Sequence, residues 1–234
     1  MKKSSIAYLF LGILLFLFTM VDNPSFSYVL ENNNSNYDFN EILNYDKTSN
    51  YIILNNNVPT FTPDEMSTIS FEKYSELDYL GRCGEAFANV SVDTMPTEER
   101  KSIGQIKPTG FHTIKYDIVD KGYLYNRCHL IAFQLTGENA NKKNLITCTR
   151  QMNSEVMVEF ENKVAKYIKE TNNHVLYRVR PYFENDNLLA TGVQIEAKSV
   201  EDNGEGISFN VFIYNIQDGI EIDYKTGDSK LALK

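Results

Sequence analysis

The chain has 234 residues, 42% of them hydrophobic, and a formal net charge of -8 at pH 7. That length is enough for one domain with a buried core, even after an N-terminal export segment is set aside. The negative net charge opposes binding to a polyanion. Three cysteines are too few for a disulfide scaffold, and the absence of a Cys-x-x-Cys pair argues against a structural zinc site.

The N-terminus has the pattern of a secretory signal. Two lysines precede a nearly unbroken apolar run at residues 6–21, and small residues suit cleavage after Ser27. The run is shorter than the roughly 20 residues of a comfortable membrane span. We therefore interpret residues 1–27 as a signal peptide, with an uncleaved membrane anchor through residues 6–21 as the alternative. Both interpretations put the rest of the chain outside the cytoplasm.

Composition then divides the exported part in two. Residues 28–65 are rich in asparagine and are interpreted as a linker or lead-in, which leaves 66–234 as the folded domain. Charge is uneven along that domain, because residues 121–180 hold ten basic and five acidic residues. A local basic face that attracts a polyanion is one interpretation of this stretch, and ordinary solvated helix charges are the other.

The predicted elements follow no regular βαβ rhythm, which favours the α+β class. A short apolar piece at 51–54 is a candidate to join a sheet. Pro96 and the acidic residues after it suit the first turn of a helix. Strands are expected where apolar and β-branched residues lie between turn signals, at 86–92, 113–119, 174–183, 189–198 and 207–216.

The clearest helix is expected at 154–169. Met157, Phe160, Val164 and Tyr167 recur at steps of three and four residues and would form one buried face. The polar residues at its start suit an N-cap.

A histidine is the usual candidate for a general base near neutral pH, and the chain has three, His112, His129 and His174. His112 lies in a predicted turn and His174 opens a predicted strand, so surface or structural roles are favoured for both. His129 is distinguished by its neighbours, since an arginine precedes it and an asparagine-rich segment follows.

The ordered set of residues around His129 carries a family resemblance. Asn126-Arg127-Cys128-His129, then Asn144, then Asn153 ahead of a helix with Glu161, resembles the DNA/RNA non-specific endonuclease family. These are ββα-metal nucleases, marked by an Asp-Arg-Gly-His motif followed by a metal-binding asparagine. The resemblance runs from about Gly81 to Gly227 and is greatest to secreted DNases and DNA-entry nucleases of streptococci.

That resemblance implies an α+β fold with a mixed, mainly antiparallel sheet and a ββα-metal core. It also implies an exported nuclease of a Gram-positive bacterium that cuts DNA and RNA with little sequence preference. Mg²⁺ is the expected cofactor, with Mn²⁺ or Ca²⁺ as alternatives.

The resemblance also assigns roles to single residues. His129 would be the general base, Asn153 would hold the metal, Glu161 would orient water near it, and Arg127 would contact phosphate. The alternatives are a helix N-cap for Asn153, a scaffold salt bridge for Arg127 and an exposed helix position for Glu161. No basic residue lies three or four positions from Glu161. Further candidates for substrate contact or support of the site are Asn126, Asn144, Arg150 and Arg178.

Two residues depart from the family motif, since Asn126 stands where the family has Asp and Cys128 where it has Gly. These changes keep open a second class of function, a nuclease fold with weakened or lost activity that keeps DNA affinity or a surface-attachment role. A cysteine hydrolase built on Cys128 and His129 is disfavoured, because consecutive residues on a strand point to opposite faces.

Overall fold

The computed structural model describes residues 49–233, so the predicted signal peptide or anchor at 1–27 lies outside the described residues. Within that range no helix is both long and apolar enough to cross a membrane.

A six-stranded antiparallel sheet in the order β1-β8-β7-β6-β3-β2 forms the framework. The strands predicted at 174–183, 189–198, 207–216 and 86–92 are all present in this sheet, with ends that differ from the prediction by a few residues. The predicted α+β class with a mainly antiparallel sheet is confirmed. The strands are β1 (Tyr51–Ile53), β2 (Phe71–Tyr74), β3 (Ala86–Val90), β6 (Val175–Tyr182), β7 (Gly192–Ser199) and β8 (Ser208–Tyr214).

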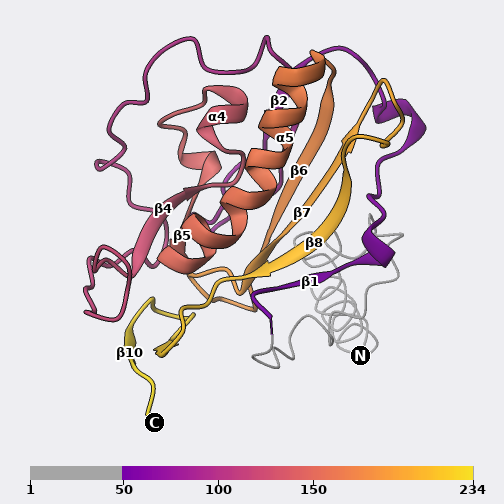
Figure 1. The fold of residues 1–234 in the computed structure, drawn as a ribbon. Coiled ribbons are helices and arrows are strands. Elements are labelled where there is room, and N and C mark those ends of the chain that lie inside the picture. The colour runs from indigo at the N-terminus through magenta and orange to yellow at the C-terminus, as the bar shows by residue number, and fades with distance from the viewer. Residues whose placement is uncertain (1–48, 234) are drawn as a thin grey trace, which may run out of the picture. The chain divides into compact units, whose positions relative to one another are not determined.

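One long helix lies along one face of this sheet (Figure 1). It consists of a π-helical turn, η4 (Met152–Met157), followed by α5 (Val158–Thr171). Of the predicted face, Met157, Phe160 and Val164 are buried in the main core and Tyr167 packs against it partly buried. Ile168, which was not predicted, is also buried there. The predicted N-cap is wrong, because the helix begins before Asn153 and η4 has no side-chain cap.

A second, two-stranded sheet packs in the same core. Strands β4 (Tyr125–His129) and β5 (Leu145–Thr149) pair antiparallel, and the short helix α4 (Phe133–Thr136) lies between them in sequence. Side chains of β4 and β5 share the main core with α5 and with β3, β6, β7 and β8. Neither strand of this hairpin was predicted from the sequence, although the first of them ends at His129.

The other face of the large sheet is covered by the N-terminal part of the described chain. Phe61 stacks on Phe87 at 5.8 Å between ring centroids, and Met66 packs in the same cluster. Strand β1 pairs with β8, as its apolar sequence suggested. The part of the expected lead-in that the structure describes, residues 49–65, is thus folded onto the domain.

Two predicted elements are wrong. The segment after Pro96 forms turns and bends rather than a helix. Residues 113–119 contribute only an isolated bridge between Lys115 and Tyr123, because the chain there turns back at Lys121 and Gly122, both with positive φ. A second short hairpin, which was not predicted, pairs β9 (Ile220–Ile222) with β10 (Ser229–Leu231).

A disulfide joins Cys128 of β4 to Cys148 of β5, with their Cα atoms 5.9 Å apart. Both residues are fully buried on the core side of the hairpin. Cys83 is a buried free thiol that contacts the carbonyl oxygens of Lys142 and Leu145 at 3.2 Å. The cysteine-hydrolase interpretation fails on this geometry, because the Cys128 sulfur is bonded and lies on the opposite face of β4 from His129.

We expect the cross-link to stabilise the fold without taking part in catalysis. A disulfide that closes a loop of this length contributes about 3 kcal/mol, which corresponds to roughly 6–12 °C in melting temperature for a domain of this size. Cys128→Ala/Cys148→Ala should therefore melt lower by about that amount, as should the wild type under reducing conditions. Cys83→Ala, which removes a buried thiol without breaking a cross-link, is the matched control.

Nuclease activity measured below the melting transition should survive in the double variant and in Cys128→Gly. Loss of activity in a folded Cys128→Gly protein would contradict the view that no thiol is required.

Candidate active site

His129, the last residue of β4, is 6% exposed and has both ring nitrogens engaged. Its Nε2 lies 2.8 Å from the carbonyl oxygen of Asn139. Because a carbonyl oxygen can only accept a hydrogen bond, Nε2 must carry the proton when the ring is neutral. The lone pair is then on Nδ1, and Nδ1 is the nitrogen available to accept a proton from substrate or water.

Arg100 approaches this lone pair, with its Nη2 3.4 Å from Nδ1 of His129. Burial lowers the pKa of His129, the hydrogen bond to the Asn139 carbonyl raises it in part, and the charge of Arg100 adds a smaller lowering. The balance favours the neutral imidazole, which is the form a general base requires.

Arg100 was not identified from the sequence. It lies within a short charged run, Glu98 to Lys101, in a long segment without helix or strand, and such a run is typical of any solvated surface. Only the folded chain shows that Arg100 reaches His129. It also acts electrostatically on Glu161, so it connects the hairpin side of the site with the helix side.

Asn153 lies in the π-helical turn η4, and its side chain is partly buried. It does not cap the helix. Its amide nitrogen contacts the Ser154 hydroxyl at 3.3 Å, which leaves the amide oxygen as a possible ligand. A π-helical turn inside an α-helix is a frequent feature of functional sites, because it changes the direction in which one turn presents its side chains.

Glu161 lies in the first turn of α5 and is partly buried. Burial raises the pKa of its carboxyl to about 7, and both Arg100 and a hydrogen bond from the Gln134 side chain act in the opposite direction. The groups that act on Glu161 therefore come from outside α5. This agrees with the sequence, in which no basic residue lies one helical turn from Glu161.

These donors fit a hard divalent cation held mainly by water. Among residues 49–233, no three His, Cys, Asp or Glu side chains gather into a set that could hold a metal ion. A site with an amide oxygen, a nearby carboxylate and several waters is how Mg²⁺ usually binds. The Asn153 amide oxygen and the Glu161 carboxylate, both on the η4–α5 helix, are the groups that would supply those two oxygen ligands or water contacts.

Arg127 is held by the loop that precedes the hairpin. Its guanidinium donates to the backbone carbonyls of Ile106 and Gly104, the latter at 3.0 Å, and lies 4.1 Å from the centroid of the Phe111 ring. It therefore ties β4 to the segment that follows Arg100.

Asn144 supports the hairpin, whereas Asn126 makes no hydrogen bond through its side-chain amide nitrogen within residues 49–233. The fully buried Asn144 accepts from the backbone N–H of Ile131 at 2.9 Å and donates to its carbonyl at 3.0 Å, which fixes the chain just after His129. Asn126 faces Cys148 across the hairpin, and its amide nitrogen is buried.

The structure does not bring Arg178 to this site, and it pairs Arg150 with an acidic residue outside the predicted set. Arg178, 7% exposed, lies on the sheet face opposite α5, where its Nε is 2.8 Å from Glu196 and its Nη1 3.0 Å from Glu65. Arg150 pairs with Asp120 at 2.9 Å.

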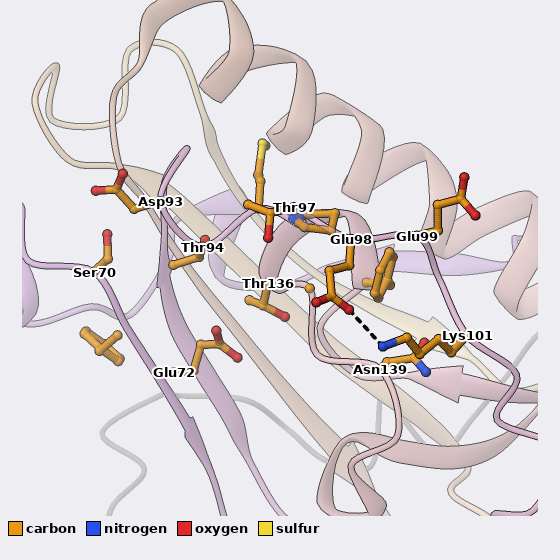
Figure 2. Close-up of a pocket in the computed structure, with 15 residues that line it drawn as sticks. Ser70, Glu72, Asp93, Thr94, Thr97, Glu98, Glu99, Lys101, Thr136 and Asn139 are labelled. Atoms are coloured by element: carbon orange, nitrogen blue, oxygen red, sulfur yellow. Dashed lines mark hydrogen bonds and ion pairs between the residues drawn. The ribbon is translucent and has the colours of Figure 1, made fainter.

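A groove of about 520 Å³ lies beside the site and has an acidic lining (Figure 2). Asn139, whose carbonyl holds His129, is one of its lining residues. Figure 2 shows Glu98 directed at Lys101, with which it forms a 2.8 Å ion pair. The other carboxylates of the lining are Glu72, Asp93 and Glu99. This charge disfavours entry of an anionic group into the groove.

Residues 63–201 match the profile of the DNA/RNA non-specific endonuclease family. The chain belongs to this family, and the protein is a nuclease. The family resemblance drawn from the motif around His129 is thereby confirmed.

Solved nuclease structures share the fold. NucA from Streptococcus agalactiae with a bound magnesium ion has a TM-score of 0.67 and 26% sequence identity, over 77% of this chain and 86% of NucA. The Sda1 nuclease with a bound zinc ion has a TM-score of 0.66 and 24% identity, over 85% of this chain and 100% of Sda1. A protein described as an extracellular endonuclease has a TM-score of 0.55 and 16% identity, over 80% of this chain and 98% of that one.

The environment of His129 predicts an imidazole that titrates below the ordinary value of 6.5. Since a positive neighbour disfavours a second positive charge, Arg100→Gln should raise this pKa. The measurement is an NMR titration of the ring signals in metal-free protein, with His129→Ala used to assign them. His112→Ala, which removes an exposed histidine, should leave the pKa of His129 unchanged. A pKa above 6.5, or one that Arg100→Gln does not raise, would contradict the proposed environment.

Proposed function

We propose that this protein is an exported, Mg²⁺-dependent endonuclease that hydrolyses phosphodiester bonds in DNA and RNA without sequence preference, with His129 as general base. The observation that carries this proposal is the pair of contacts at His129. The Asn139 carbonyl fixes the proton on Nε2, and Nδ1 is left with its lone pair on a neutral, buried ring.

In this mechanism Nδ1 of His129 removes a proton from the water that attacks phosphorus. Arg100, 3.4 Å from Nδ1, is close enough to turn its guanidinium from the imidazole to a phosphate oxygen once substrate is bound. Arg127 holds the loop that follows Arg100 against β4 and so restricts where that guanidinium can lie.

On the helix side, the amide oxygen of Asn153 would hold the metal and the carboxylate of Glu161 would orient water beside it. When bound, a divalent cation neutralises charge on the phosphate and stabilises the departing 3′ oxygen. Asn153 is neutral, so it would leave the full charge of the cation for the phosphate. The magnesium ion in the NucA structure supports the choice of metal.

Export is proposed from the signal-like sequence at 1–27 and is supported by the extracellular endonuclease among the structural matches. Retention at the membrane through residues 6–21 is the alternative form of this proposal. Little sequence preference is expected, because groups that contact phosphate carry no base information.

Replacing His129 tests the general base. His129→Ala and His129→Gly should lower turnover by at least about 10²–10⁴-fold, since that is what general-base catalysis contributes. Free imidazole should restore part of the cleavage, most in the glycine variant, and more so as pH rises and imidazole becomes neutral. His112→Ala, an exposed histidine, should retain wild-type turnover in the same plasmid-cleavage assay. Recovery with excess Mg²⁺ alone would show that His129 is a metal ligand instead.

Replacing Asn153 tests the metal site. Asn153→Ala should lose at least about 100-fold in turnover while remaining folded, because the cation supplies several kcal/mol of transition-state stabilisation. Glu155→Ala changes an exposed residue of the same π-helical turn and serves as the control. Circular dichroism and thermal melting report on the fold. Unchanged turnover and Mg²⁺ dependence in Asn153→Ala would remove this residue from the site.

A further inference from the structure

Tyr177, at the centre of β6, is completely buried beneath the η4–α5 helix. Side chains along β6 alternate between the two faces of the sheet, and Val175, Tyr177 and Val179 belong to the core that also contains Phe160 of α5. The residue after it, Arg178, faces the other side. The Tyr177 ring is thus directed toward the helix that carries the metal-site candidates.

The neighbours of Tyr177 on the adjacent strands are small. Ala88 of β3 and Ala197 of β7 lie directly opposite it in the register of the sheet. Both are fully buried. Two alanines beside one tyrosine leave room for the ring to extend away from the sheet between them.

The hydroxyl of Tyr177 is buried and has no hydrogen-bond partner among residues 49–233. Leaving such a group unsatisfied costs about 1–3 kcal/mol. A phenylalanine would fill the same space without that cost, so packing alone does not account for a tyrosine here. Buried polar groups of this kind are normally satisfied by protein atoms or by an ordered water.

Glu161 is the charged group that acts on this hydroxyl. Burial, and after it the Glu161 carboxylate, raise the pKa of Tyr177 well above its ordinary value. The phenol therefore remains protonated and presents a hydrogen-bond donor on the side of the acceptor Glu161.

We propose that Tyr177 is a positioning residue of the nuclease: its hydroxyl donates a hydrogen bond, relayed through one buried water, that holds the Glu161 carboxylate in its catalytic orientation. This inference rests on the proposed function, in which Glu161 orients water beside the metal. Glu161 is then held from both sides, by Arg100 and Gln134 near the surface and by Tyr177 from the core.

Tyr177→Phe removes only the hydroxyl. Loss of a residue that orients a metal-site group lowers activity by about 10–100-fold, and we expect a loss of that size in kcat with little change in KM for DNA. The melting temperature of the metal-free protein should change little, because the phenylalanine ring fills the same space and only one hydrogen bond to a buried water is lost.

Tyr125→Phe is the matched control. Tyr125 is 4% exposed and, within the described residues, its buried hydroxyl also has no hydrogen-bond partner. The groups that act on it electrostatically are Tyr224, Tyr116, Asp228 and Asp223 rather than Glu161. This variant should retain wild-type kcat.

A double-mutant cycle separates positioning from a general structural effect. If Tyr177 acts through Glu161, adding Tyr177→Phe to Glu161→Gln should lower kcat no further. Two results would overturn the role of Tyr177 and leave that of Glu161 intact. One is additive losses of kcat in the double variant, and the other is wild-type kcat in Tyr177→Phe while Glu161→Gln is impaired. Wild-type kcat in Glu161→Gln would instead remove Glu161 from the proposed function, and this inference with it.

Discussion

Burial of one helix against one sheet is the constraint on which the candidate site depends. Phe160, Val164 and Ile168 hold α5 in the main core, so the helix can neither rotate nor slide without exposing them. Asn153 and Glu161 are part of the same rigid element and take their positions from that packing. The π-helical turn changes the direction in which the Asn153 side chain points relative to the side chains of α5, and a regular α-helix could not make this change.

The second half of the site depends on the alternation of side chains along β4. Cys128 points into the core and is joined to Cys148, while His129 points the other way toward the Asn139 carbonyl. Asn144 then fixes the chain just after His129 through both hydrogen bonds of Ile131. The disulfide and the Asn144 hydrogen bonds fix the hairpin, and the Asn139 carbonyl then selects one tautomer of His129. Proton transfer at Nδ1 requires that tautomer.

The sequence was most informative where one pattern decides the structure. Apolar alternation predicts strands such as β8, and three-and-four spacing predicts α5, because burial of a single face dictates both. The motif around His129 located the site for a different reason, namely that its order resembles a family. Arg178 shows the limit of that approach. The resemblance made it a candidate for substrate contact, but strand alternation puts it on the far face of the sheet beside Glu196.

Other features could not be predicted because they depend on tertiary structure. Arg100 reaches His129 from a segment without regular structure, and no local pattern encodes that approach. The pairing of Cys128 with Cys148 follows from the register of a hairpin that local propensity did not indicate. The Pro96 segment has helix-start residues but no apolar face to bury, and a helix of one turn is unstable without one.

Charge explains how an acidic protein can still act on a polyanion. A net charge of -8 gives no long-range attraction to nucleic acid, so association depends on local charge near the reacting phosphate. The acidic groove beside Asn139 disfavours entry of an anionic group. Arg100 is exposed, lies 3.4 Å from the imidazole and acts electrostatically on Glu161. A phosphate that reaches His129 can replace those two weak interactions with a stronger one, so the site favours phosphate at the position where hydrolysis would occur.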